Sequence, residues 1–299
     1  MAITINGTYA GELALPYIHA ALLSGDTLAK GYVTLKEGVK YKAVLKKLSS
    51  ANLVQSFTCD FSDPSDLTLD ESILVVTDLK VNLEVCKSEF AHDWEAAQTG
   101  RGFANDVVPA NFQDFLIGYA AANVAQNIEF NIWQGGNGTY SAFDGLEKNI
   151  KTASSLETTW GTMTVNNVIE NIQSVLAMLP PSLVGDPMVK VYVNRATAQL
   201  YKQAVAALGY AFEFNAFKEF NLQIDGYDIY ICPGISDGTV IVSRPDNLYV
   251  GVDANSDFAE VKVVDMSLTD ASDLVRMAMK FRVGTAVGFG SDVAIGYID

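Results

Sequence analysis

The sequence predicts an α+β fold, and three stretches of the chain carry that prediction. Residues 50–90 alternate apolar and polar side chains in the manner of β-strands. Val108–Trp133 has apolar side chains at helical spacing. Asn194–Asp253 has the pattern of a capped helix followed by strands. We therefore expect a fold that contains both sheets and long helices.

The composition fits a water-soluble protein that covers part of its surface with neighbours. The chain has 299 residues, of which 49% are apolar and 18% charged, enough for one large or two smaller cores. Its mean hydropathy of +0.17 is high for a soluble monomer. No run approaches the ~20 apolar residues that a bilayer-spanning helix needs. A well-packed α/β enzyme is the alternative reading of this composition.

The charge is strongly acidic but unevenly distributed. Nucleic-acid binding depends on Lys and Arg at phosphates, so a chain with a net charge of −15 is not expected to grip DNA as a whole. Residues 1–50 nevertheless contain six lysines against three acidic residues. This basic arm before an acidic body suggests contacts between the arm and a neighbour, although solvated lysines explain it equally well. The three cysteines form no paired framework, as expected in a reducing compartment.

The first ninety residues predict an extended arm and a β-ribbon. Residues 1–49 hold a helix-like piece, Leu13–Leu23, and a strand-like piece, Gly31–Lys36, with too little apolar material for a core of their own. Leu53–Phe61 and Ile73–Val85 then predict a long two-stranded ribbon with an acidic tip. Because an isolated ribbon is marginal in water, it needs a partner surface on its own body or on a neighbouring subunit.

Two long helices follow the ribbon. Pro109 suits the first turn of the helix at Val108–Trp133, and a glycine-rich stretch from Gly135 ends it. Its apolar stripe predicts a face packed in a core: Phe112, Phe115, Leu116, Tyr119, Val124 and Ile128. Thr162–Leu179 is a second amphipathic helix, which stops at Pro180.

The later part of the chain predicts a small α/β lobe and then returning strands. A short strand leads into a helix, Arg195–Leu208, for which Asn194 is the expected N-cap. Two strands, Leu222–Cys232 and Thr239–Ser243, then form a hairpin around a turn rich in glycine. Three strand-like runs complete the chain: Phe258–Val264, Leu274–Val283 and Thr285–Tyr297.

The sequence carries no pattern of catalytic, cofactor-binding or metal-ligating residues. His19 and His92 are the only histidines, and neither has further ligands at zinc spacing. Gly284–Gly290 is rich in glycine but lacks the Lys-Ser/Thr of a phosphate-binding loop. Glycines that relieve crowding in a curved strand explain this run better. We therefore expect a protein that is not an enzyme and that binds no cofactor or metal.

The order of these elements, with the wording of Asp225–Tyr230 and Asn247–Gly251, resembles the major capsid proteins of tailed bacteriophages. That family has the Hong Kong 97-type fold, with an N-terminal arm, an extended β-hairpin loop, a peripheral domain with a long spine helix, and an axial α/β domain. The resemblance covers essentially the whole chain. It implies an arm at residues 1–49, an extended loop at 50–99, a peripheral domain at 100–161 and 240–299, and an axial domain at 162–239.

The resemblance implies a function in assembly. A major capsid protein associates with itself into hexamers and pentamers, which form the icosahedral or prolate head shell around a double-stranded DNA genome. Portal, scaffolding and decoration proteins are the other partners that it implies, with packaged DNA merely nearby and no membrane. The implied location is the virion, after assembly in the cytoplasm of the host bacterium.

Other readings remain open at this stage. An encapsulin-like nanocompartment has the same fold but encloses protein cargo instead of DNA. An acidic hydrolase would form a particle of one or a few subunits and would have paired catalytic groups. A tail-tube or adhesin protein would consist mostly of β-strands and would lack the long helix.

Opposite charges on two segments suggest a contact between subunits. We expect the acidic ribbon tip of one subunit to meet lysines of its neighbour. Exposed ion pairs contribute only about 0–1 kcal/mol each, so this contact would set register rather than affinity. The residues involved would be Asp60, Asp63, Asp66, Asp70 and Glu71 on the tip, and Lys40, Lys42, Lys46 and Lys47 on the neighbour.

Overall fold

The computed structural model describes residues 6–10, 25–50, 56–57, 59, 67–86, 110–208, 222–253, 260–266, 270, 272 and 274–299. Several expectations fall outside these residues. They are the helix-like piece Leu13–Leu23, the two histidines, and the predicted tip residues Asp60, Asp63 and Asp66.

The described strands form two six-stranded sheets and one separate ribbon. Sheet 1 has the order β1–β12–β13–β11–β2, with β5 also paired to β13. Its strands are β1 Asn6–Ala10, β2 Thr34–Glu37, β5 Thr77–Cys86, β11 Leu248–Asp253, β12 Glu260–Asp265 and β13 Leu274–Val287. Sheet 2 has the order β6–β14–β10–β7–β9–β8. Its strands are β6 Glu157–Trp160, β7 Lys190–Val193, β8 Leu222–Ile224, β9 Tyr227–Ile231, β10 Val240–Ser243 and β14 Val293–Ile298. The ribbon pairs β3 Lys42–Ser50 with β4 Leu67–Val75.

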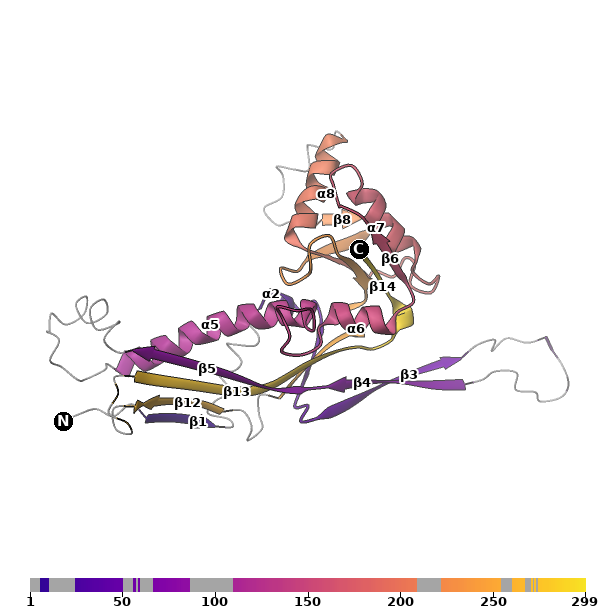
Figure 1. Ribbon diagram of the computed structural model, residues 1–299. Helices are drawn as coiled ribbons and strands as arrows, with labels where there is room; N and C mark the ends of the chain where they lie inside the picture. Colours follow the sequence, from indigo (N-terminus) through magenta and orange to yellow (C-terminus); the bar gives the residue numbers. More distant parts are fainter. Residues whose placement is uncertain are drawn as a thin grey trace.

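The sheets and helices are stacked in layers, with helices between the two sheets and further helices on the outer face of sheet 2 (Figure 1). The long helix α5 (Ala110–Gln134) and the shorter α6 (Leu146–Ala153) share one hydrophobic core with sheet 1 and with one face of sheet 2. On the opposite face of sheet 2, α7 (Val168–Ala177) and α8 (Arg195–Ala207) build a second core. Alternate residues of one strand supply the two cores: Tyr192 faces α5, whereas Val191 and Val193 face α7 and α8.

The predicted long helix is confirmed as α5, which ends at Gln134. Val124 and Ile128 are buried as expected, together with Ala120 and Ala121, whose small side chains let the helix lie close to the sheet. Tyr119, which we expected in the same stripe, is 58% exposed and so does not belong to the core-facing side of the helix.

The capped helix is also confirmed. The Asn194 side chain accepts a hydrogen bond of 3.2 Å from the backbone N–H of Ala196, at the first turn of α8. The other predicted helix, α7, is shorter than the range Thr162–Leu179. It buries the predicted face through Val168, Ile172, Val175 and Leu176.

Each of the two expected ranges contains a strand, but their pairing as a hairpin is wrong. A tight turn at Asp225 and Gly226, with φ of 50° and 86°, breaks Leu222–Cys232 into β8 and β9. β9 and β10 then lie on opposite sides of β7, which is parallel to β9 and antiparallel to β10. The physical reason is the helix α8 between β7 and β9, because a helical crossover brings the next strand back parallel to the first.

The break expected at Gly284, between the runs Leu274–Val283 and Thr285–Tyr297, is wrong, because β13 continues through it to Val287. A Cβ atom on Gly284 would lie 2.0 Å from the carbonyl oxygen of Val75, at the base of the ribbon. A glycine is therefore required where another backbone crosses the strand, as the glycine-rich sequence suggested. The last strand, β14, begins after the short 3-10 helix η6 (Gly290–Asp292).

Candidate functional site: the projecting ribbon

The ribbon β3–β4 extends away from the body of the molecule (Figure 1). Its strands differ from those that the sequence predicted. The first strand is Lys42–Ser50 rather than Leu53–Phe61, in which the described residues Ser56, Phe57 and Cys59 are not in a strand. The expected second strand, Ile73–Val85, is divided at Val76, so that β4 belongs to the ribbon and β5 to sheet 1.

One face of the ribbon is fastened to the body near its base. Leu45 and Leu74 are buried in a small core with Val39, Val76 and Ala286. The Ser72 hydroxyl donates a hydrogen bond of 2.7 Å to the carbonyl oxygen of Val287. These contacts orient the ribbon and bury this one face against the body.

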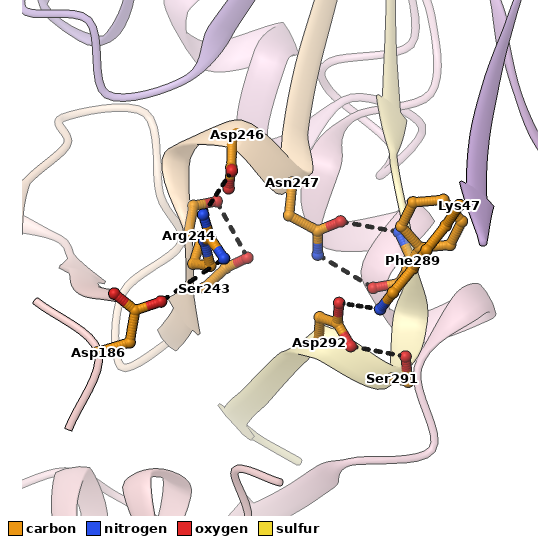
Figure 2. Close-up of polar contacts among 9 residues, drawn as sticks. All are labelled: Lys47, Asp186, Ser243, Arg244, Asp246, Asn247, Phe289, Ser291 and Asp292. Carbon is orange, nitrogen blue, oxygen red and sulfur yellow. Dashed lines mark hydrogen bonds and ion pairs between the residues drawn. The ribbon is translucent and has the colours of Figure 1, made fainter. Parts of the chain in front are cut away.

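Polar contacts fix the loop at Phe289, which strand β3 of the ribbon contacts through Lys47 (Figure 2). Lys47 of β3 forms an ion pair with Asp292 of η6, and its ammonium group lies 5.0 Å from the centre of the Phe289 ring. The Asn247 side chain accepts a hydrogen bond of 2.8 Å from the Phe289 N–H and donates one of 3.0 Å to the Phe289 carbonyl. Asn247 is buried, so the loop at Phe289 is held in one conformation and presents Asp292 to Lys47.

Arg244 ties the neighbouring segment to the lobe around sheet 2 (Figure 2). Its guanidinium lies 2.8 Å from an Asp246 oxygen, in the 3-10 helix η4 (Pro245–Asn247), and 3.5 Å from an Asp186 oxygen. These groups are partly exposed, and such ion pairs contribute about 0–1 kcal/mol each. Their role is to position η4, which leads directly into β11 of sheet 1.

The other face of the ribbon is apolar and exposed. Directly opposed side chains share this face: Val44 with Ile73, Leu48 with Leu69, and Lys42 with Val75. The exposed fractions of the five apolar residues are 48% for Val44, 61% for Leu48, 54% for Leu69, 53% for Ile73 and 43% for Val75. In their midst Lys46 and Glu71 are also opposed, with an ion-pair distance of 3.2 Å. An exposed face that combines several apolar side chains with a few charged ones is typical of a protein–protein contact.

The structure describes several of the residues that were predicted to form a charge contact between subunits. Lys46 and Glu71 belong to the same ribbon, Lys47 pairs with Asp292, and Asp70 lies opposite Lys47 in the strand register. Lys40 and Lys42 are exposed. Contact between the tip and lysines of a neighbour stays a prediction, and two of the four lysines already have partners in their own chain.

The apolar face is what the sequence analysis missed. Its residues occupy every second position in each strand, at 44 and 48 around Lys46 and at 69, 73 and 75 around Glu71. This period of two was a detectable signal. Residues up to 49 were assigned to a basic arm, and the first strand of the ribbon was expected at Leu53–Phe61, so this alternation was overlooked.

Two other kinds of site, a metal cluster and a membrane-spanning helix, are not found among the described residues. No cluster of three or more His, Cys, Asp or Glu residues among them could hold a metal ion. No helix in the part of the chain that the structure describes is long and apolar enough to cross a membrane. The ribbon is therefore the feature of the described fold that most needs a functional explanation.

Comparison with solved structures finds chains with a similar fold. A chain of the satellite phage P4 procapsid, solved with the size determination (Sid) protein, matches all of this chain and 93% of its own length, with a TM-score of 0.60 and 10% identity. The capsid of a native GTA particle matches 93% of this chain and 90% of its own, with a TM-score of 0.58 and 13% identity. The fold is that of a phage capsid protein.

A third match is to a chain of the Microbacterium phage Oxtober96. It covers 92% of this chain and 91% of its own length, with a TM-score of 0.56 and 14% identity. The sequence itself matches no family model and no curated protein. The capsid fold of this chain is thus recognised through its three-dimensional arrangement, over nearly its whole length, at very low sequence identity.

Proposed function

We propose that this chain is the major capsid protein of a tailed bacteriophage, with the Hong Kong 97-type arrangement of domains. In this assignment the ribbon is the extended loop, which would begin near Lys42 and so include the end of the range 1–49 first given to the arm. The helix α5 and sheet 1 form the peripheral domain, within 100–161 and 240–299. The helices α7 and α8 with the strands β7, β8 and β9 form the axial domain, within 162–239.

The observation that carries this proposal is the exposed apolar face of a projecting ribbon, on a fold that matches a procapsid chain over all of this chain. A two-stranded ribbon is marginal by itself, and an apolar face on it is unfavourable in water. Both features are explained when the ribbon lies on an adjacent subunit and buries Leu48, Leu69 and their neighbours there. The monomer would then be an incomplete unit whose missing contacts are supplied by copies of itself.

Shell formation follows from repeated weak contacts of this kind. Identical subunits close a shell of hexamers and pentamers by using a few interfaces many times. A single contact with a dissociation constant of about 1 mM corresponds to only about −4 kcal/mol, which lets misplaced subunits leave. A subunit held by several neighbours is retained much more strongly, because each further contact is intramolecular.

The remaining partners and the location are part of the same proposal. The shell would enclose double-stranded DNA in the virion, after assembly in the host cytoplasm, with portal, scaffolding and decoration proteins as further partners. The net charge of −15 supports a wall that does not hold DNA tightly, since phosphate binding requires clustered Lys and Arg. In this proposal the role of the chain is structural.

The test is to express the full chain in bacteria and examine it by velocity sedimentation and negative-stain electron microscopy. The proposal predicts shells, tubes or sheets built from this chain. Shells that enclose protein instead of DNA during infection or native expression would favour the encapsulin-like alternative. Single compact molecules at every concentration, with turnover of a substrate, would exclude both.

A further inference from the structure

Two buried carboxyl groups lie in the helix layer between sheet 1 and sheet 2. Glu129 on α5 is 5% exposed, and Glu147 on α6 is 1% exposed. Buried Glu is rare unless its charge is paired, because transfer of a carboxylate out of water is unfavourable. Neither residue belongs to the ribbon, so their presence needs a separate explanation.

Glu129 holds the segment that precedes the ribbon. One carboxyl oxygen accepts a hydrogen bond of 3.2 Å from the Thr27 backbone N–H, and the other accepts from the Thr27 hydroxyl. Thr27 lies in the short helix α2 (Asp26–Ala29) and is fully buried, and its hydroxyl accepts a 2.9 Å hydrogen bond from the Trp133 indole N–H. Glu129 thus fastens α2 to the middle layer through neutral donors.

Glu147 holds the loop that connects β9 to β10. Its two oxygens accept hydrogen bonds of 2.7 Å each from the Ser236 backbone N–H and the Ser236 hydroxyl. The same loop lies directly against α5, because a Cβ atom on Gly234 would be 2.3 Å from the Glu129 carbonyl oxygen. The Gln134 side chain donates a further hydrogen bond of 2.8 Å to the Gly234 carbonyl. Both carboxyls therefore act where sheet 2 meets the helices.

The segment held by Glu129 also contacts sheet 2. The Tyr32 ring stacks on Tyr230 at a centroid distance of 4.1 Å, and the Tyr192 hydroxyl donates a hydrogen bond of 2.8 Å to the Tyr32 carbonyl. Three parts of the chain consequently meet at one joint: the helices α5 and α6, sheet 2, and residues 25–33 before β2. The two carboxyls provide the polar links within this joint.

The charged and titratable groups around the two carboxyls do not neutralise them by direct pairing. Asp26 and Lys30 face Glu129 from α2 and form an ion pair with each other at 3.5 Å. Cys232 faces Glu129 from the end of β9, and burial raises the pKa of its thiol well above the usual value, so it stays neutral. Lys151 lies one turn beyond Glu147, with its ammonium group 3.7 Å from the centre of the Tyr297 ring.

We propose that this joint is proton-responsive: protonation of Glu129 and Glu147 strengthens the attachment of sheet 2 and α2 to α5 and α6, and ionisation weakens it. The cause is the cost of keeping two carboxylates away from water among neutral donors. The proposal concerns the folded chain itself and holds whether or not the chain forms a shell. In a shell, the strength with which sheet 2 and α2 are attached to α5 and α6 would then depend on pH.

The direction of the effect follows from proton linkage. Burial raises the pKa of both carboxyls above 4.5, and the hydrogen bonds from Thr27 and Ser236 oppose the rise only in part. The folded chain therefore binds more protons than the unfolded chain between the ordinary value and the raised values. The stabilising contribution is fully present below the unfolded pKa and is lost as the pH rises through the folded pKa.

The experiment compares urea unfolding of the full chain at several pH values from 4.5 to 8, in one assembly state verified by sedimentation. The double variant Glu129→Gln/Glu147→Gln mimics the protonated form. Its folding equilibrium constant relative to wild type should increase as the pH rises, about tenfold for each unit of raised pKa. The control Glu170→Gln, at an exposed position on α7, should differ from wild type by a constant factor. A constant ratio for the double variant as well would overturn the proposal.

A direct measurement keeps the proposal testable if the double variant does not fold. Infrared spectra of the wild-type chain should retain the carbonyl band of protonated carboxylic acid at a pH where exposed carboxyls have ionised. The single variant Glu147→Gln should reduce this band. Loss of the whole band together with that of the exposed carboxyls would show that both groups ionise normally, and the proposal would fail.

Discussion

Truncation of the opposed pair Leu48 and Leu69 to alanine should weaken assembly without unfolding the subunit. Full burial of a leucine side chain contributes about 1.5–3 kcal/mol. These two side chains are 61% and 54% exposed, so roughly half of that contribution, about 1 kcal/mol each, is left to be gained in a contact. Truncation of both side chains should therefore cost about 2 kcal/mol of binding free energy per contact, which corresponds to a roughly thirtyfold higher dissociation constant.

The assay is the concentration at which particles first form, measured by light scattering and sedimentation for wild type and for Leu48→Ala/Leu69→Ala. We expect this critical concentration to rise by at least tenfold, while the thermal unfolding of the unassembled subunit changes little, because both side chains are already exposed. Val184→Ala, which truncates an apolar side chain of 63% exposure outside the ribbon, is the matched control. An equal rise for Val184→Ala, or none for the ribbon variant, would refute the reasoning.

Three further changes test the fold around the site. Leu74→Ala removes a fully buried side chain from the small core at the ribbon base. It should lower the free energy of urea unfolding by about 2–3 kcal/mol and make the ribbon more sensitive to protease. An unchanged digestion pattern would show that this core does not hold the ribbon. Gly284→Ala would place a Cβ atom 2.0 Å from the Val75 carbonyl oxygen and should destabilise the fold by about 1–3 kcal/mol. The control Gly161→Ala, which has open space around it, should unfold at nearly the wild-type temperature. Equal melting temperatures for the two variants would contradict the close approach of the Val75 backbone to β13. Asn194→Ala should cost about 1 kcal/mol of unfolding free energy through the lost N-cap of α8, and no change in the denaturation midpoint would argue against that cap.

The elements that could be predicted from sequence are those whose signals are local. The α5 helix shows its apolar spacing and its glycine stop within one continuous stretch, and the α8 helix shows its Asn194 cap. Local patterns do not contain the order of strands in a sheet. The relation of β9 to β10 depended on where the crossover through α8 returned the chain, and the sequence analysis placed them side by side in error.

The candidate site was predicted in outline only. A ribbon was expected, but its first strand was placed too late, because lysines and apolar side chains are mixed on both faces of Lys42–Ser50. The hydrophobic pattern that fixes register is weak where neither face is fully buried. The buried carboxyls Glu129 and Glu147 had no signal of their own, since a single Glu in a helix is ordinarily solvated and only the packed fold shows otherwise.

A three-dimensional reconstruction of particles assembled from the purified chain tests the central claim most directly. We predict a closed shell in which density for β3 and β4 crosses a subunit boundary and covers the face that carries Leu48 and Leu69. A particle in which this face stays in solvent, or a chain that remains a single 32.3 kDa molecule under all conditions of assembly, would contradict the account.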